Sequence, residues 1–151
     1  MSKYQLAQAI LKLSESPTWE LARQEWQLVQ IEETDDVQTC LCGHFPIKEL
    51  CILQNKLNSK VTTVGNCCVK KFLGLPSNKI FTAVKRVRKD NQKSLNAETI
   101  KMAHERGWID NWQKDFYLDI MRKRSLTDRQ RVKKHQINEK ILQRVRKTGG
   151  G

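Results

Sequence analysis

The chain has 151 residues, of which 38% are hydrophobic and 29% are charged, and its formal net charge is +12. This length suits one ordinary domain or a small module with a helical extension. No apolar run approaches the ~20 residues that a membrane-spanning helix needs, and residues 1–14 lack the continuous apolar stretch of a secretion signal. We therefore expect a cytoplasmic protein with no membrane partner.

The positive charge is concentrated in two blocks of the sequence. Residues 79–93 hold six basic and one acidic side chain, and residues 122–151 hold eleven basic and two acidic ones, whereas residues 1–39 are net acidic. Excess basic charge gathered in this way is typical of a protein that binds a polyanion. The alternative is a surface whose charge only keeps the protein soluble.

The N-terminal segment predicts two helices and a strand. Residues 3–14 place apolar side chains at helical spacing, which predicts an amphipathic helix. Ser16-Pro17 predicts the start of a second helix, because serine caps helices and proline suits the first helical position. Residues 27–33 favour a strand over a helix, with a closing turn at residues 34–36.

Five cysteines lie between Cys40 and Cys68. Their odd number and the lack of a secretion signal favour metal binding over a disulfide framework. Strands are predicted over residues 47–54 and 61–64, because residues 55–60 are rich in turn formers. If Gln54 pairs with Val61, Cys51 lies opposite Val64, and Asn66 can then cap a short helix that begins at Cys67.

This order of a two-ligand knuckle, a hairpin and a helix resembles a treble-clef zinc finger. The resemblance covers about 35 residues, from Cys40 to Gly74. The runs Cys-x-Cys-Gly-His and Val-Gly-Asn-Cys-Cys-Val-Lys-Lys-Phe are also similar to small zinc modules in phage and mobile-element proteins. The resemblance implies bound zinc more strongly than any activity. The chain departs from the treble-clef pattern in having Cys-x-Cys for Cys-x-x-Cys, and adjacent cysteines in the helix.

Zinc in a structural site takes four ligands in tetrahedral geometry. Cys40 and Cys42 can share one ion because Gly43 permits a tight turn between them. Adjacent helical residues point ~100° apart, so only one of the two helix cysteines is expected to bind. Cys68 is preferred because it lies further into the first turn, where the helix dipole stabilises a thiolate.

Cys51 is the predicted fourth ligand, and His44 is its alternative. The expected zinc site is structural. A catalytic zinc keeps an open position beside a general base, and only Glu49 is near in sequence to serve as one. A further alternative is that the cysteines are only small buried apolar residues.

Four helices are predicted after Gly74-Leu75-Pro76, which ends the zinc segment. They cover residues 77–89, 96–107, 110–124 and 128–146, with caps expected at Ser77 and Asn96 and a capping box at Thr127–Gln130. The predicted fold is α+β and mostly helical, with a zinc-anchored, treble-clef-like hairpin between flanking helices. Its expected parts are an acidic helical segment (1–39), the zinc module (40–74), a basic helical region (75–148) and a flexible tail (149–151).

The last helix carries the clearest basic row. At 100° per residue, Arg129, Lys133, Lys140 and Arg144 fall within ~60° of one another, beside an apolar row that would pack on the protein. Such a helix can lie along a phosphate backbone. The predicted nucleic-acid-binding residues are Lys70, Lys71, Arg86, Lys89, Arg122, Lys123, Arg124, Arg129, Lys133, Lys140 and Arg144. Four nearby aromatic residues could stack on bases, although helical spacing favours the core for most of them: Trp108, Trp112, Phe116 and Tyr117.

These patterns predict a zinc-containing accessory protein that binds DNA or RNA through the backbone, with a larger protein or ribonucleoprotein complex as a further expected partner. An enzyme is not expected, because the three histidines lie in no hydrolase or nuclease motif and there is no glycine-rich phosphate loop. The alternative is a protein–protein adaptor whose zinc is structural and whose basic helix docks on an acidic partner. A small nuclease would need an acidic or histidine cluster that the sequence lacks.

Overall fold

A computed structural model describes residues 2–148, so the predicted tail at residues 149–151 lies outside the described residues. The chain divides into two compact units. The first consists of the chain up to Asn78 together with the segment from Arg146, and the second consists of Lys79–Val145. Among the described residues, no helix combines the length and the apolar character required to cross a membrane. The fold is α+β, as predicted.

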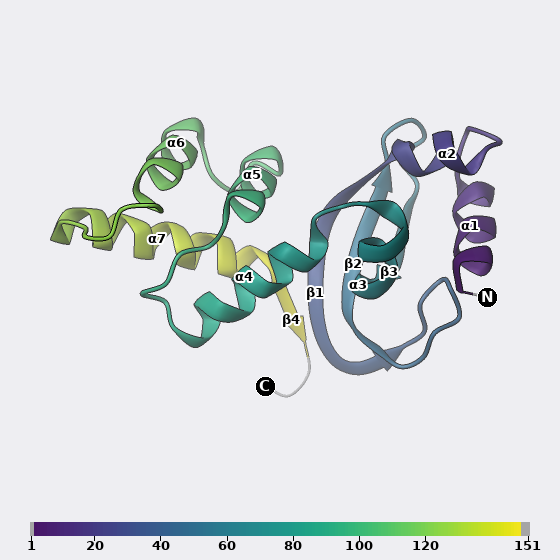
Figure 1. The fold of residues 1–151 in the computed structure, drawn as a ribbon, viewed down its shortest axis with the longest axis horizontal. Coiled ribbons are helices and arrows are strands. Elements are labelled where there is room, and N and C mark those ends of the chain that lie inside the picture. Colours follow the sequence, from purple (N-terminus) through teal and green to yellow (C-terminus); the bar gives the residue numbers. More distant parts are fainter. Residues whose placement is uncertain (1, 149–151) are drawn as a thin grey trace. The chain divides into compact units, whose positions relative to one another are not determined.

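The first unit is built on a sheet whose described strands follow the order β3-β2-β1-β4 (Figure 1). These strands are β1 (Trp26–Gln38), β2 (Ile47–Asn55), β3 (Val61–Gly65) and β4 (Arg146–Thr148). Strand β2 pairs antiparallel with both β1 and β3, whereas β4 pairs parallel with β1. The predicted hairpin is therefore one half of a larger sheet, and β2 is an inner strand.

The hairpin has the predicted register. Gln54 pairs with Val61, and Cys51 pairs with Val64. The Asn55 side-chain oxygen closes the turn by accepting hydrogen bonds from the backbone amides of Leu57 (2.7 Å) and Asn58 (3.2 Å). An asparagine that holds the backbone ahead of it in this way is a common turn former.

Strand β1 is longer than predicted. The predicted turn at residues 34–36 is wrong: the strand continues to Gln38, which pairs with Ile47. The register shifts between Glu33 and Gln38, and within this irregular stretch the Thr34 hydroxyl accepts a hydrogen bond from the Asp36 amide at 3.0 Å. A neighbouring strand outweighs local turn preference here, because β2 offers backbone hydrogen bonds on both sides of the shift.

The N-terminal helix has its predicted place, but the second helix starts later than predicted. Helix α1 spans Ser2–Leu13, and α2 spans Trp19–Ala22, followed by a 3₁₀ turn η1 (Arg23–Glu25). Thr18, not Ser16, precedes α2. The Ser16 amide instead donates a hydrogen bond to the Glu25 carboxylate at 2.8 Å, so Ser16 belongs to the loop between the helices.

Glu25 is a buried carboxylate that joins this loop to the hairpin. It accepts hydrogen bonds from the Glu15 amide, the Ser16 amide and the Asn55 side chain, each at 2.8 Å. Hydrogen bonding from Ser16, opposed by burial and supported by Asn55, lowers the pKa of Glu25 to about 2. The carboxylate therefore stays ionised in the folded protein, as three donors require.

A short helix follows β3 directly. Helix α3 (Asn66–Cys68) runs into a π-helical turn η2 (Val69–Leu73), which ends at Gly74 with φ +68° as predicted. The predicted cap at Asn66 is wrong, because Gly65 takes the capping position and no side chain caps the helix. The buried Asn66 side chain instead accepts a hydrogen bond from the Ser77 hydroxyl at 2.6 Å and donates one to Glu49 at 3.1 Å. Hydrogen bonds to residues distant in the sequence thus take the place of the predicted helix cap at Asn66.

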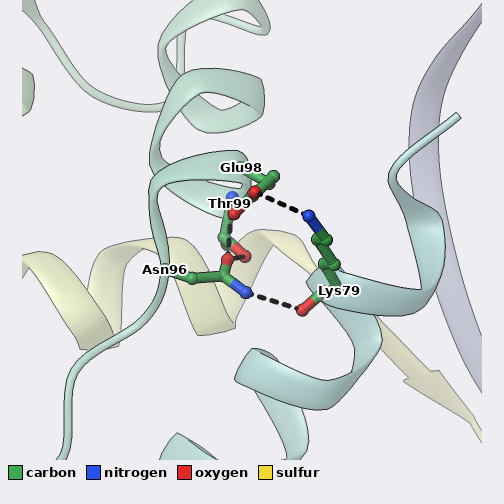
Figure 2. Close-up of polar contacts among 4 residues, drawn as sticks. All are labelled: Lys79, Asn96, Glu98 and Thr99. Atoms are coloured by element: carbon green, nitrogen blue, oxygen red, sulfur yellow. Dashed lines mark hydrogen bonds and ion pairs between the residues drawn. The ribbon is translucent and has the colours of Figure 1, made fainter.

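The second unit is helical. It contains most of α4 (Ser77–Lys89), and α5 (Ala97–Glu105), α6 (Asn111–Ile120) and α7 (Asp128–Arg144). Asn96 caps α5 by accepting a hydrogen bond from the Thr99 amide (3.1 Å), and it also donates to the Lys79 carbonyl (2.9 Å), which ties α5 to α4. Figure 2 shows this cap beside the Lys79–Glu98 ion pair at 3.4 Å. The capping box at Thr127 and Gln130 is present as predicted.

Two helices end earlier than predicted. Helix α6 stops at Ile120 instead of residue 124, and α7 stops at Arg144 instead of residue 146. The buried Val145 is already extended (φ −80°, ψ 121°), and β4 begins at the next residue. Pairing with β1 provides the backbone partners that one more helical turn would otherwise supply.

Candidate metal centre

Three buried cysteine sulfurs lie within 4.8 Å of one another: those of Cys40, Cys42 and Cys68. Each of these three cysteines is at most 6% exposed. Sulfurs that share a tetrahedral ion with Zn–S bonds of ~2.3 Å lie about 3.8 Å apart. The observed spacing is therefore close to what a shared ion needs, and none of the chain's five cysteines forms a disulfide.

A tight turn positions the first two sulfurs. The Gly43 amide donates to the Cys40 carbonyl at 2.8 Å, and the Cys40 amide donates to the His44 carbonyl at 2.9 Å. Gly43 has φ +89°, a conformation that a residue with a Cβ adopts only under strain. The His44 amide lies 3.4 Å from the Cys42 sulfur and donates to it. The structure thus has the knuckle that the Cys-x-Cys-Gly spacing predicted.

The end of β3 contributes a second hydrogen bond to sulfur. The Gly65 amide donates to Cys40 Sγ at 3.2 Å. A Cβ at Gly65 would lie 3.3 Å from the Ile47 side chain and 3.6 Å from the same sulfur. Amide donors stabilise an ionised thiolate and are the usual outer partners of a metal-bound cysteine.

Without a cation, this cluster disfavours ionised sulfur. Burial raises the pKa of Cys68 well above that of an ordinary thiol, and its neighbours Cys42 and Cys40 raise it further. A bound divalent cation reverses this balance, because a coordinating thiol loses its proton outright. The cluster is therefore suited either to three protonated thiols or to a metal ion.

Cys51, the predicted fourth ligand, is not a member of the close group of three. It is fully buried in β2, where burial raises the pKa of its thiol to about 12 and a hydrogen bond with Ser77 opposes that rise. In the observed register Cys51 faces Val64, whereas Gly65, the residue that meets the Cys40 sulfur, pairs with Leu50. Cys51 still lies near enough to Cys40 for that neighbour to contribute to the raised pKa of its thiol.

His44, the alternative fourth ligand, and Cys67, the other helix cysteine, line a small cavity together with the cluster. This cavity, of about 160 Å³, is bordered by the three clustered cysteines, by the exposed residues His44 and Cys67, and by Lys71. His44 is the alternative that the sequence offered. Cys67 follows the end of β3 next to Cys68, where helical geometry turns the two side chains ~100° apart.

The predicted basic residues are exposed in the structure. Lys70 and Lys71 lie on η2, and Arg86 and Lys89 lie on α4, where the Arg86 guanidinium donates to the Ser94 carbonyl at 2.6 Å. Residues 122–124 follow the end of α6 and are not part of a helix. The remaining four lie on α7: Arg129, Lys133, Lys140 and Arg144.

Sequence reasoning missed a buried polar network in the second unit. Lys134 Nζ donates to the Gln92 carbonyl at 2.7 Å, and the Asn138 side chain donates to the carbonyls of Asn91 (3.2 Å) and Lys93 (3.1 Å). The Tyr117 hydroxyl accepts from the Leu95 amide at 2.8 Å, so three side chains fix the loop between α4 and α5.

The signal for this network lies in the spacing along α7. Lys134 and Asn138 are four residues apart and flank the buried Ile137 and Ile141 on the inner side of the helix. Polar residues on a buried face need partners there.

Fold and site together define an α+β protein with a buried three-cysteine cluster that could hold a metal ion. Comparison of the chain with protein-family models, with curated proteins and with solved structures gave no match. The likeness to treble-clef modules therefore depends on the residues of the cysteine segment alone.

Proposed function

We propose that this protein binds the phosphate backbone of nucleic acid through α7 and uses one zinc ion to stabilise its sheet-containing unit. The observation that carries the nucleic-acid half is the row of four exposed cations on α7. The same helix buries Ile137 and Ile141, so its apolar face is packed and its basic row is left to solvent. A fixed helix that presents cations along one face is a suitable surface for phosphates.

The zinc half of the proposal follows from the ligand type. Three clustered thiols form a soft donor set, which selects zinc or an iron–sulfur cluster over magnesium or calcium. His44 is the proposed fourth ligand, because it borders the same cavity and its side chain is longer than that of Cys67. The ion would join the knuckle to α3, so its proposed role is to stabilise the fold.

Salt dependence tests the nucleic-acid half. The fourfold variant Arg129→Ala, Lys133→Ala, Lys140→Ala, Arg144→Ala is compared with a control that removes four exposed lysines from the first unit: Lys12, Lys48, Lys56 and Lys60. Binding to random-sequence duplex is measured by fluorescence anisotropy at several salt concentrations. If each α7 cation touches one phosphate, the slope of log affinity against log salt falls in magnitude by about 4 × 0.9.

The control variant should keep the wild-type slope and most of the affinity. Equal behaviour of the two fourfold variants would show that general charge, and not α7, attracts the polyanion. Unchanged affinity in the α7 variant would remove the nucleic-acid assignment of this helix. In that case an acidic protein partner becomes the better explanation of the basic row.

A further inference from the structure

One aromatic pair with an exposed member lies beside the basic row of α7. Trp112, on α6, is 58% exposed, and its ring stacks on that of Phe116 with centroids 5.2 Å apart and planes 9° from parallel. Trp108 and Tyr117, the other two aromatic residues of this segment, are at most 7% exposed and belong to the core. Packing in the core therefore does not explain the presence of a tryptophan at position 112.

The pair is connected to the basic row by a cation. Lys133 Nζ lies 5.9 Å from the centroid of a Trp112 ring, at the outer limit of a cation–π contact, ~6 Å. The next residue along α6, Gln113, accepts a hydrogen bond from Lys140 at 3.2 Å. Lys133 therefore contacts the exposed indole and Lys140 contacts the residue next to it, and neither contact is strong enough to resist displacement.

We infer that Trp112 is a stacking platform for an unpaired base, so that the α7 surface is built for single-stranded nucleic acid. This inference rests on the proposed function, because the phosphates next to the stacked base are held by Lys133 and Lys140. A base that stacks on Trp112 displaces the Lys133 amine from the ring, and the amine then turns to a phosphate. The Phe116 ring stacks on the indole and limits its movement.

Charge complementarity supports this occupant. Arg129, Val132 and Lys133 border an open surface hollow with Asp128, whose carboxylate is already paired with Arg131 at 3.2 Å. An aromatic face beside several cations fits a strand that presents both bases and phosphates. In a duplex the bases are stacked on one another, so their faces are closed to Trp112.

The test uses the full chain and four fluorescently labelled probes: a twelve-nucleotide oligothymidylate, its oligouridylate counterpart, an abasic strand of equal length and a duplex of equal length. Trp112→Ala should weaken binding to at least one of the two base-bearing strands roughly 10-fold, since one stacked base contributes that much on substitution. Binding to the abasic strand and to the duplex should change less than about twofold. Trp112→Phe should restore most of the lost affinity, because it keeps an aromatic ring.

Tyr4→Ala is the matched control. Tyr4 is 70% exposed on α1 of the first unit, so its truncation removes an exposed aromatic ring that is not part of the α7 surface, and affinity should stay within about twofold of the wild type. The native protein should also lose tryptophan fluorescence when oligothymidylate binds. Trp112→Phe should bind without most of that loss, because Trp112 is the exposed one of the four tryptophans.

The outcomes separate the two proposals. Unchanged binding of both base-bearing strands by Trp112→Ala, with binding lost in the fourfold α7 variant, overturns the stacking platform and leaves backbone binding standing. An equal loss for the duplex and the single strands also overturns the platform. Failure of the wild-type protein to bind any of the probes overturns both proposals.

Discussion

The backbone amide of Gly65 donates a hydrogen bond to the sulfur of Cys40 across 3.2 Å. This contact joins the last residue of β3 to a knuckle 25 residues earlier in the chain. Gly65 has φ −66° and ψ 147°, so its conformation does not require glycine. What the position needs is a donor for the sulfur and little volume beside Ile47.

Substitution of Gly65 separates these two needs. Gly65→Ala keeps the amide and adds a Cβ, whereas Gly65→Pro suits the φ angle and removes the N–H. We expect Gly65→Pro to lower metal affinity about 10–100-fold relative to Gly65→Ala, the range for loss of an outer partner of a ligand. Competition with a chromophoric chelator measures both affinities, and equal values would show that the amide does not tune the sulfur.

Ligand variants test the composition of the metal site. We expect one zinc per chain by elemental analysis, and loss of both metal and cooperative folding in Cys40→Ser and Cys68→Ser. His44→Ala should weaken metal retention, whereas Cys67→Ala should retain the ion. Cys51→Ala should also retain it, while losing some stability as a core truncation. Loss of metal in Cys51→Ala with full retention in His44→Ala would return the fourth ligand to β2.

Substitution of two adjacent lysines on α7 should have different effects: one should change stability and the other nucleic-acid binding. Lys134 is 8% exposed and its amine is bonded to the Gln92 carbonyl, whereas Lys133 is exposed. Lys134→Met should lower the free energy of unfolding by ~1–2 kcal/mol, because it removes a hydrogen bond from a charged donor. Lys133→Met should leave stability within about 0.5 kcal/mol and reduce the salt slope of nucleic-acid binding by roughly 1.

Urea unfolding and salt titrations on both variants make this comparison. A reduced salt slope in Lys134→Met with intact stability would mean that this amine faces phosphate instead of the loop between α4 and α5.

Glu25 should make the stability of the first unit depend on acid pH. Its pKa is lowered to about 2, chiefly by hydrogen bonding with Ser16, while the unfolded value is 4.5. Because the folded pKa is the lower one, the carboxylate's contribution is fully present above about pH 4.5 and is lost as the pH falls through 2. The difference in stability between the wild type and Glu25→Gln should therefore be largest near neutral pH.

Urea unfolding of both proteins at pH 7, 5, 4 and 3 measures that difference, which should shrink steadily below pH 4.5. A constant difference over this range would show that the carboxylate is not ionised in its hydrogen-bonded position.

The features that the sequence by itself determined about this protein are local. Turn formers between two strands determined the hairpin register that pairs Cys51 with Val64. Side-chain oxygens three residues from a backbone amide determined the caps at Asn96 and Thr127. The Cys-x-Cys-Gly spacing determined the knuckle, because a glycine after the second cysteine allows the tight turn with φ +89°.

Only the tertiary structure decided the features whose partners are distant in the chain. Ser16 leaves its expected cap because Glu25 binds its amide, and β1 extends past residues 34–36 because β2 lies alongside. Cys51 lies outside the close cysteine group although it pairs with Val64 as predicted, and Lys134 is bonded to loop residues 42 and 40 positions earlier in the chain. A hydrogen bond to a distant group outweighs a local preference of similar size, because burial makes an unpaired polar group costly.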